Sequence, residues 1–266
     1  MKITSSSNDK IKYLRSLYQK KYRRKNNQFV LEGVRLIEEA VQEKIGLEQV
    51  FYSEYLLRNK QGQDLLNQLQ DQGLTTYEIA DDLLQQIADT VSPQGVLAIA
   101  NKIEYEMCNI LAEKNGLILI IDQIQDPGNL GTIIRTADAA GFDGVITTKG
   151  TVSLYNQKTI RATMGSFFRT PIAKVNDLSE FKKAITASDF NLVVADTAGE
   201  NYHFEIDYLP ATAIIVGNEA HGPRQELIDL ANQSIKIPLI GRAESLNVAM
   251  ATSVIVYEAV RQKLDK

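Results

Sequence analysis

The run LILIID at residues 117–122 is apolar on both faces, a pattern that is typical of a central strand in a parallel sheet. Similar short apolar runs follow at intervals along the rest of the chain, and segments with helical spacing separate or follow them. This alternation predicts an α/β fold with a parallel sheet. The further strands are expected at residues 145–148, 170–175, 192–196, 214–216 and 235–239.

Ligands of open parallel sheets bind beyond the carboxyl ends of the strands. Polar loops follow four of the expected strands, and they contain most of the side chains that could carry chemistry. The sequence therefore predicts one ligand site built from several separate loops. These loops are expected at residues 123–129, 197–201, 217–223 and 240–247.

Residues 1–103 have their own alternation of strand and helix patterns, which predicts a small α/β domain. Its strands are expected at 29–31, 49–53, 75–79 and 96–100. The polar stretch 104–115 is expected to be a linker or connecting helix, and 116–266 the second domain. A chain of 266 residues is long enough for two domains that each have a hydrophobic core.

Charge is distributed unevenly along the chain. Residues 1–35 contain ten Lys and Arg but only Asp9 and Glu32, a net charge of +8, which leaves −12 for the rest of a chain whose total is −4. The stretch KKYRRKNNQF also mixes cations with aromatic rings, as phosphate contact and base stacking require. The alternative is a solvated helix face. If the segment binds RNA, we expect the contacts at Lys20, Lys21, Arg23, Arg24 and Arg35.

Several classes of function lose support from what the sequence lacks. Cys108 is the only cysteine, and His203 and His221 stand far apart, so no metal site is expected. Neither GxGxxG nor GxxxxGK[ST] occurs, which disfavours a nucleotide-binding oxidoreductase or a P-loop enzyme. No apolar run is long enough for a membrane helix and no signal peptide is visible, so we expect a cytoplasmic protein with no membrane partner.

The stretch DPGNLGTIIRTADAAG supplies the first candidate motif. Asn129 could cap a helix over 130–140, and Arg135 lies on its polar side, one turn after Gly131. An Arg beside bare backbone can hold a phosphate or a carboxylate. The alternative is an ordinary ion pair between Arg135 and Asp138 at i,i+3.

The loops GNEAHGP and IGRAESLN supply the second and third motifs. Gly217 and Gly222 permit close backbone approach or positive φ. Glu219 between them is either an exposed acid on a turn or the orienting group of a site. Ser245 could cap the last helix, and Asn247 could extend that cap or point at a ligand.

Taken together and in this order, these three stretches resemble the motifs of the SpoU (TrmH-type) branch of the SPOUT RNA methyltransferases, over about residues 117–260. Residues 1–103 resemble, more weakly, the ribosomal-protein-like substrate-binding domain that often precedes it. The resemblance implies a deep trefoil knot, S-adenosylmethionine as cofactor and a homodimer with the active site at its interface. The chain departs from the pattern at Ala249, where many relatives have Ser, and matches only loosely over 161–172.

Individual roles follow from the resemblance. Arg161 joins the expected RNA-binding residues. The catalytic set is expected at Asn129, Arg135, Glu219, Ser245 and Asn247. The cofactor is expected to contact Thr197, Gly217, Gly222, Ile237, Leu239 and Leu246.

The reaction implied is transfer of a methyl group to a ribose 2′-hydroxyl of RNA. We expect ribosomal RNA of the large subunit, with transfer RNA as the alternative. A guanidinium keeps its proton to above about pH 12, so Arg135 is expected to grip phosphate and stabilise an alkoxide, acting as a base only if the site shifts it strongly. The competing interpretations are a methyltransferase that acts on bases or proteins and a catalytically silent assembly factor that binds RNA.

Overall fold

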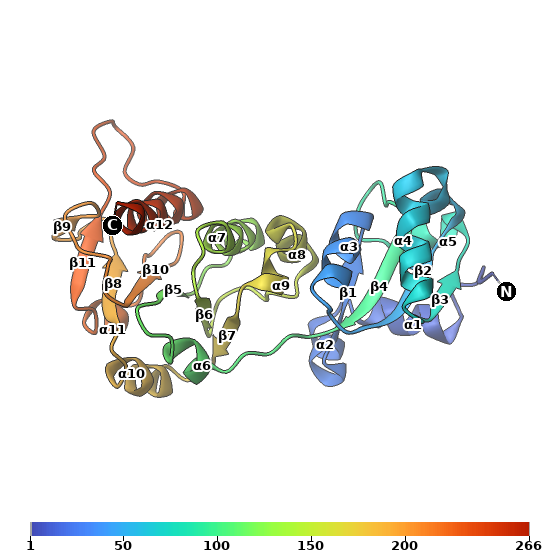
Figure 1. The fold of residues 1–266 in the computed structure, drawn as a ribbon, viewed down its shortest axis with the longest axis horizontal. Helices are drawn as coiled ribbons and strands as arrows, with labels where there is room; N and C mark the ends of the chain where they lie inside the picture. Colours follow the sequence, from blue (N-terminus) through green and yellow to red (C-terminus); the bar gives the residue numbers. More distant parts are fainter. Residues whose placement is uncertain (1, 266) are drawn as a thin grey trace. The chain divides into compact units, whose positions relative to one another are not determined.

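A computed structural model describes residues 2–265, which divide into two compact units (Figure 1). The N-terminal unit runs to Ile103 and includes Tyr155–Arg161, and the C-terminal unit contains Glu104–Leu154 and the chain from Ala162 onward. The segment 104–115 groups with the C-terminal unit, where helix α6 (Met107–Leu111) buries Ile110. The limits of independently folding domains stay predictions.

The N-terminal unit is an α/β structure. Its elements are α1 (Asp9–Ser16), α2 (Lys20–Asn26), β1 (Gln28–Glu32), α3 (Val34–Gln42), β2 (Leu47–Tyr52), the 3-10 helix η1 (Glu54–Arg58), α4 (Lys60–Asp71), β3 (Thr76–Glu78), α5 (Asp81–Ile87) and β4 (Val96–Asn101). The strands form one sheet in the order β1-β4-β2-β3. Strand β4 is antiparallel to β1 and β2, and β3 is parallel to β2.

Helix α1 shows how the sequence determines this unit. The Asn8 side chain accepts a hydrogen bond from the Lys10 backbone N–H at 2.9 Å, which caps the helix as expected of an N-terminal Asn. Ile11 and Leu14 then fall on one side and are fully buried with α5 and the sheet. The Asn8 cap and the spacing of the two apolar residues thus account for this helix.

The C-terminal unit contains a fully parallel sheet in the order β7-β6-β5-β10-β8-β11-β9. All five residues of β5 are buried, which agrees with the apolar pattern of residues 117–121. The elements after α6 are β5 (Leu117–Ile121), α7 (Pro127–Ala139), β6 (Gly144–Thr148), α8 (Gln157–Thr163), α9 (Ser166–Arg169), β7 (Ile172–Val175), α10 (Leu178–Thr186), β8 (Asn191–Ala195), β9 (Asn201–Tyr202), β10 (Thr212–Val216), α11 (Gln225–Ile228), β11 (Gln233–Lys236) and α12 (Val248–Leu264). Of these, α8 belongs mostly to the N-terminal unit.

Helices cover both faces of this sheet (Figure 1). On one face Ile110 of α6, Phe181 of α10 and Leu227 of α11 pack on a core that includes Ile118 and Ile215. On the other face α7 and α12 pack against each other. The carboxyl ends of the central strands and the first turns of α7 and α12 therefore come together at one edge.

The last part of the sheet differs from the sequence prediction. We expected a strand over 235–239, but β11 ends at Lys236. No helix begins between Lys236 and Val248, where α12 starts. Pro238 has no N–H to donate to a neighbouring strand, which explains the early end. The two-residue edge strand β9 was not predicted, because two residues are too few to show a periodicity.

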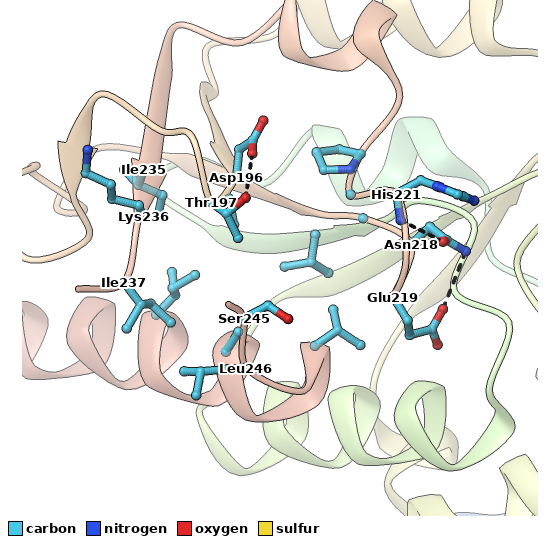
Figure 2. A pocket seen from close by; sticks show the side chains of 18 of the residues that line it. Asp196, Thr197, Asn218, Glu219, His221, Ile235, Lys236, Ile237, Ser245 and Leu246 are labelled. Carbon is cyan, nitrogen blue, oxygen red and sulfur yellow. Dashed lines mark hydrogen bonds between the residues drawn. The ribbon is translucent and has the colours of Figure 1, made fainter. Parts of the chain in front are cut away.

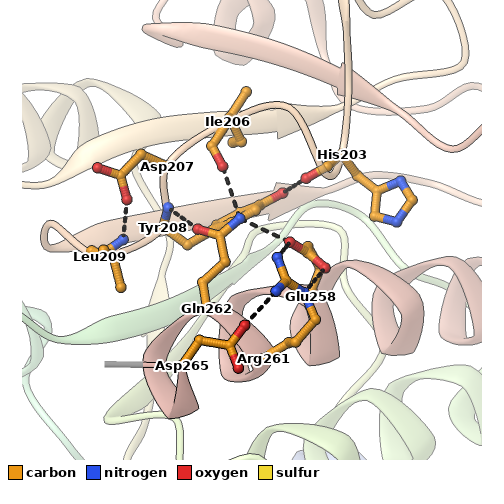
Figure 3. A network of polar contacts seen from close by, with 9 residues as sticks. All are labelled: His203, Ile206, Asp207, Tyr208, Leu209, Glu258, Arg261, Gln262 and Asp265. Atoms are coloured by element: carbon orange, nitrogen blue, oxygen red, sulfur yellow. Dashed lines mark hydrogen bonds and ion pairs between the residues drawn. The ribbon is translucent and has the colours of Figure 1, made fainter.

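A polar network fixes the second half of α12 to the segment after β9 (Figure 3). The Gln262 side chain accepts a hydrogen bond from the Tyr208 N–H and donates to the Ile206 carbonyl, both at 3.0 Å. Arg261 pairs with Glu258 at 2.8 Å, and this neighbour, more than the opposing effect of burial, lowers the pKa of the Glu258 carboxyl. The C-terminal helix is thus held firmly at the end far from its first turn.

Candidate active site

A cavity of about 450 Å³ opens beyond the carboxyl ends of β8, β10 and β11 (Figure 2). Glu219 and Ser245 line it together with the segment that follows β11. The structure thus brings the three predicted loops after these strands to one hollow. All the residues that were expected to contact the cofactor line it, namely Thr197, Gly217, Gly222, Ile237, Leu239 and Leu246.

The loop after β10 is shaped by its glycines and Asn218. A Cβ on Gly217 would lie 1.9 Å from the Pro223 nitrogen, and Gly222 adopts a φ of +68°. Gly217 thus meets the expectation of close backbone approach, and Gly222 meets the expectation of positive φ. The Asn218 side chain accepts hydrogen bonds from the N–H groups of Ala220 and His221 at 2.9 and 3.2 Å.

A buried ion pair anchors the end of this loop to the centre of the sheet. Asp122, directly after β5, is fully buried, and it accepts hydrogen bonds from Arg224 Nη2 at 2.6 Å and from the Arg224 backbone N–H at 3.0 Å. Thr148 donates a further hydrogen bond to Asp122 at 2.6 Å. This pair was not predicted from the sequence. Its only local signal was an acid at the end of an apolar strand.

Glu219 is the centre of a hydrogen-bond network between the loops. Its carboxylate accepts from Asn129 Nδ2 at 3.0 Å and from the N–H groups of Gln125 and Asp126 at 3.2 and 3.1 Å. Burial acts to raise the pKa of Glu219, but these hydrogen bonds outweigh it and hold the pKa below its ordinary value. Glu219 is therefore a carboxylate at neutral pH, and its contacts tie the loop after β10 to Asn129 and to the start of α7.

The same network reaches the first turn of the last helix. Asn129 Oδ1 accepts a hydrogen bond from Asn247 Nδ2 at 3.0 Å, so Glu219, Asn129 and Asn247 form one chain of contacts. The Asn247 side-chain oxygen also accepts from the N–H groups of Ala249 and Met250. Three of the five expected catalytic residues are connected, although they lie up to 118 positions apart.

Two predicted helix caps were assigned to the wrong residue. The N-cap of α7 is Asp126, whose side chain accepts from the Asn129 N–H at 2.8 Å, and Asn129 itself lies in the first turn. The N-cap of α12 is Asn247 instead of Ser245. Ser245 is exposed in the cavity wall, and within residues 2–265 its side chain has no hydrogen bond. Both asparagines are thereby fixed in place beside Glu219.

Arg135 projects from the exposed side of α7 and forms no ion pair within the described part of the chain. The alternative that it pairs with Asp138 is wrong. Asp138 instead binds Arg169 of α9, with an Nη2 to Oδ2 distance of 2.8 Å. The guanidinium of Arg135 is therefore available to a ligand.

The expected RNA-binding residues lie in different environments. Lys20, Lys21, Arg24 and Arg35 are exposed. Arg23 is a correction, because its side chain is buried and donates to the carbonyl oxygens of Leu17 and Tyr18 at 3.0 and 2.5 Å. Its guanidinium thus links α2 to the segment that follows α1, and burial lowers the pKa of this group. The remaining residue, Arg161, is half-exposed and pairs with Asp89 at 2.7 Å.

Two further features bear on the class of protein. Between residues 2 and 265 there is no group of three or more His, Cys, Asp or Glu side chains that could hold a metal ion. Over the same range, the helices lack the combination of length and apolarity that a membrane span requires. His221 lines the cavity and belongs to no such group within the described residues.

Comparison with known proteins identifies relatives over nearly the whole chain. The 23S rRNA (guanosine(2553)-2'-O)-methyltransferase RlmP of Bacillus subtilis (strain 168) is 35% identical over 257 residues, 96% of this chain and 97% of the relative. The 23S rRNA (uridine(2479)-2'-O)-methyltransferase of Streptomyces viridochromogenes is 29% identical over 248 residues, 91% of this chain and 85% of the relative.

Solved structures and family models agree with these relatives. The AdoMet-bound rRNA methyltransferase from Sinorhizobium meliloti superposes with a TM-score of 0.88 at 33% identity, covering 98% of this chain and 97% of that one. Residues 8–98 match the model of the MRM3-like substrate binding domain. Residues 116–257, which contain every loop of the cavity, match the model of the SpoU rRNA Methylase family. The chain belongs to the SpoU rRNA methylase family.

Proposed function

We propose that this protein methylates a ribose 2′-hydroxyl of large-subunit ribosomal RNA and uses S-adenosylmethionine as the methyl donor. The observation that carries the proposal is the network of Glu219, Asn129 and Asn247 beside a cavity of cofactor size. The substrate class is supported by relatives of nearly full length whose names specify 23S rRNA.

The cavity suits S-adenosylmethionine in size and lining. Its volume of about 450 Å³ falls within the range of about 300–1,000 Å³ that is usual for small-molecule sites. Ile237, Leu239 and Leu246 offer apolar contact, and Gly217 and Thr197 offer close-lying backbone. When bound, the cofactor supplies a sulfonium methyl group as the electrophile.

The protein side chains have complementary roles in this reaction. A ribose hydroxyl is a weak nucleophile until its proton is drawn away. Arg135, exposed and without an ion-pair partner within residues 2–265, binds the neighbouring phosphate and stabilises the developing alkoxide, while the hydroxyl proton passes to solvent water. Asn129 and Asn247 orient the ribose, and Glu219 keeps both amides in position. Much of the catalysis then comes from positioning.

The assembly proposed for the enzyme is a homodimer, in the cytoplasm, whose methyltransferase unit is threaded as a trefoil knot. An apolar stripe on α12 supports the dimer. Met250, Val254, Tyr257 and Leu264 are 57%, 41%, 51% and 80% exposed, and their spacing places them along one side of the helix. Sedimentation of the wild type and of Val254→Glu tests this, because a charge on the stripe should favour the monomer.

The exposed cations of α2 form the proposed RNA contact. Reversing Lys20, Lys21 and Arg24 to Glu should weaken binding to rRNA and lower the slope of log affinity against log salt by roughly one unit for each lost phosphate contact. Arg23 is left unchanged because its substitution would disrupt packing. An unchanged slope would return this segment to a solvated surface.

The experiment that tests the function is a methylation assay with labelled S-adenosylmethionine on large-subunit rRNA and on tRNA, followed by mapping of 2′-O-methyl groups. We expect the label on one rRNA nucleotide. Label on tRNA alone would overturn the substrate class, and label on a base would overturn the reaction. Arg135→Ala should bind the cofactor normally in calorimetry while methyl transfer falls by about a hundredfold or more.

A further inference from the structure

The Asp138–Arg169 ion pair lies one helical turn beyond Arg135. Arg169 Nε and Nη2 approach Asp138 Oδ2 at 3.1 and 2.8 Å, and Nε also lies 3.4 Å from Oδ1. The two side chains are only 34% and 22% exposed. Partial burial strengthens such a pair relative to one in open solvent, so Asp138 is held firmly.

The backbone that carries Arg169 is itself anchored. Phe167 and Phe168, the two residues before it in α9, are buried with ring centroids 4.0 Å apart, and α9 packs on α7. The Thr170 N–H closes the turn on the Ser166 carbonyl at 3.0 Å. The backbone position of Arg169 relative to α7 is therefore fixed by packing.

Asp138 is the only acidic residue within α7, and it stands three positions after Arg135. Residues at i and i+3 of a helix are neighbours whose charged side chains pair readily. In the structure this pairing does not occur, because Arg169 occupies the carboxylate. An Asp138 without Arg169 would be a half-buried charge with Arg135 as its nearest cation on the helix.

We infer that Arg169 is a positioning residue for methyl transfer: by holding Asp138, it keeps that carboxylate from capturing Arg135 and leaves the Arg135 guanidinium available to the RNA. The inference rests on the role proposed for Arg135. It predicts that loss of Arg169 damages the reaction only as long as residue 138 is an acid, a relationship that a purely structural role would not produce.

The test compares Arg169→Ala, Asp138→Asn and the double variant with the wild type, using full-length protein and a large-subunit rRNA transcript. At saturating RNA and cofactor, Arg169→Ala should lower kcat about tenfold, the effect expected when a charged hydrogen bond competes for the catalytic group. Asp138→Asn alone should stay within about twofold of wild type, and the double variant should recover to that level. Arg169→Lys, which keeps a cation beside Asp138, should retain most activity.

Cofactor affinity and thermal unfolding are measured on every variant. An Arg169→Ala defect that Asp138→Asn does not relieve, in a folded protein with normal cofactor affinity, would overturn the inference. A raised KM for RNA with unchanged kcat would also overturn it, because it would assign Arg169 to RNA contact. Full activity in Arg135→Ala would overturn the role of Arg135 and this inference with it. Loss of activity in Arg135→Ala, together with an unrelieved Arg169→Ala, would overturn this inference alone.

Discussion

The two segments that line most of the cavity, 217–224 and 237–246, are held to the protein in different ways. The first is fixed by the Asp122–Arg224 ion pair at its end, by Asn218 inside it and by the hydrogen bond from Asn129 of α7 to Glu219. The second has no hydrogen bond to any other residue in the described part of the chain and is exposed over most of its length. Its fixed point is Asn247, the residue that follows it.

The first segment therefore forms a cavity wall whose conformation is fixed by contacts within the protein. The second segment forms a wall that lacks such contacts and depends on a bound ligand for its order. The first segment presents its backbone and carboxylate in one geometry before the cofactor arrives, which lowers the entropic cost of binding. The second contributes apolar side chains such as Leu246, 42% exposed, that gain most when a ligand covers them. Substitutions in the first segment should therefore change stability, and those in the second should change ligand-dependent properties.

The largest effect is expected from Asp122→Ala. This change leaves Arg224 half-buried without its acid and removes the acceptor of Thr148. Breaking a buried ion pair on one side costs about 3–5 kcal/mol, so the free energy of unfolding measured in urea should fall by that amount. Cofactor affinity in calorimetry should fall with it. A loss below about 1 kcal/mol would show that the loop is held by other contacts.

Glu219→Gln should have the next largest effect, and that effect should depend on pH. The folded-state pKa of Glu219 lies below its ordinary value of 4.5. Its contribution to stability is therefore present above that value and is lost as pH falls through the folded-state pKa. The variant should lose about 1 kcal/mol near neutral pH and approach the wild type as the pH falls through the folded-state pKa. Urea unfolding over a series of pH values from neutral to acid checks this, and a pH-independent difference would contradict it.

The sequence allowed the fold class and the three motif loops to be predicted, because each depends on local signals. The buried run before Asp122 indicated a parallel sheet, and the glycines of GNEAHGP indicated a tight loop. Helix caps were harder to assign. Asn and Ser near a helix start are both good caps, and only the backbone shows that Asn247 takes this position in α12.

Contacts between distant residues could not be predicted from one sequence. Asp122 and Arg224 are 102 positions apart, and no periodicity links them. Charge alone also misled the interpretation of Arg23, which stands among exposed cations but points inward to carbonyl oxygens. The partner of Asp138 is a similar case, because the i,i+3 rule favours Arg135 while tertiary packing supplies Arg169.

Asn247→Ala is expected to have an effect on stability no larger than that of Glu219→Gln at neutral pH, because it removes one helix cap at the boundary between the two walls. Loss of an Asn cap costs about 1 kcal/mol, which thermal unfolding can measure. Asn247→Asp is the matched control, since it keeps the acceptor for the N–H groups of Ala249 and Met250 but cannot donate to Asn129. The control should keep its stability yet lose methyl transfer. Equal stability losses in both variants would contradict the capping role.

Ser245→Ala should have the smallest effect on the free protein and so tests the second wall most directly. Ser245 is exposed and has no hydrogen bond within residues 2–265, so the free energy of unfolding should change by less than about 0.5 kcal/mol. Methyl transfer should nevertheless slow if the hydroxyl contacts the ribose or the cofactor in the complex. Measuring how much added S-adenosylmethionine stabilises the protein shows which of the two the hydroxyl contacts. Slower transfer with unchanged cofactor-induced stabilisation assigns the hydroxyl to the RNA, whereas a weakened stabilisation assigns it to the cofactor. A loss of stability in the ligand-free variant would instead show that segment 237–246 is held by the protein itself.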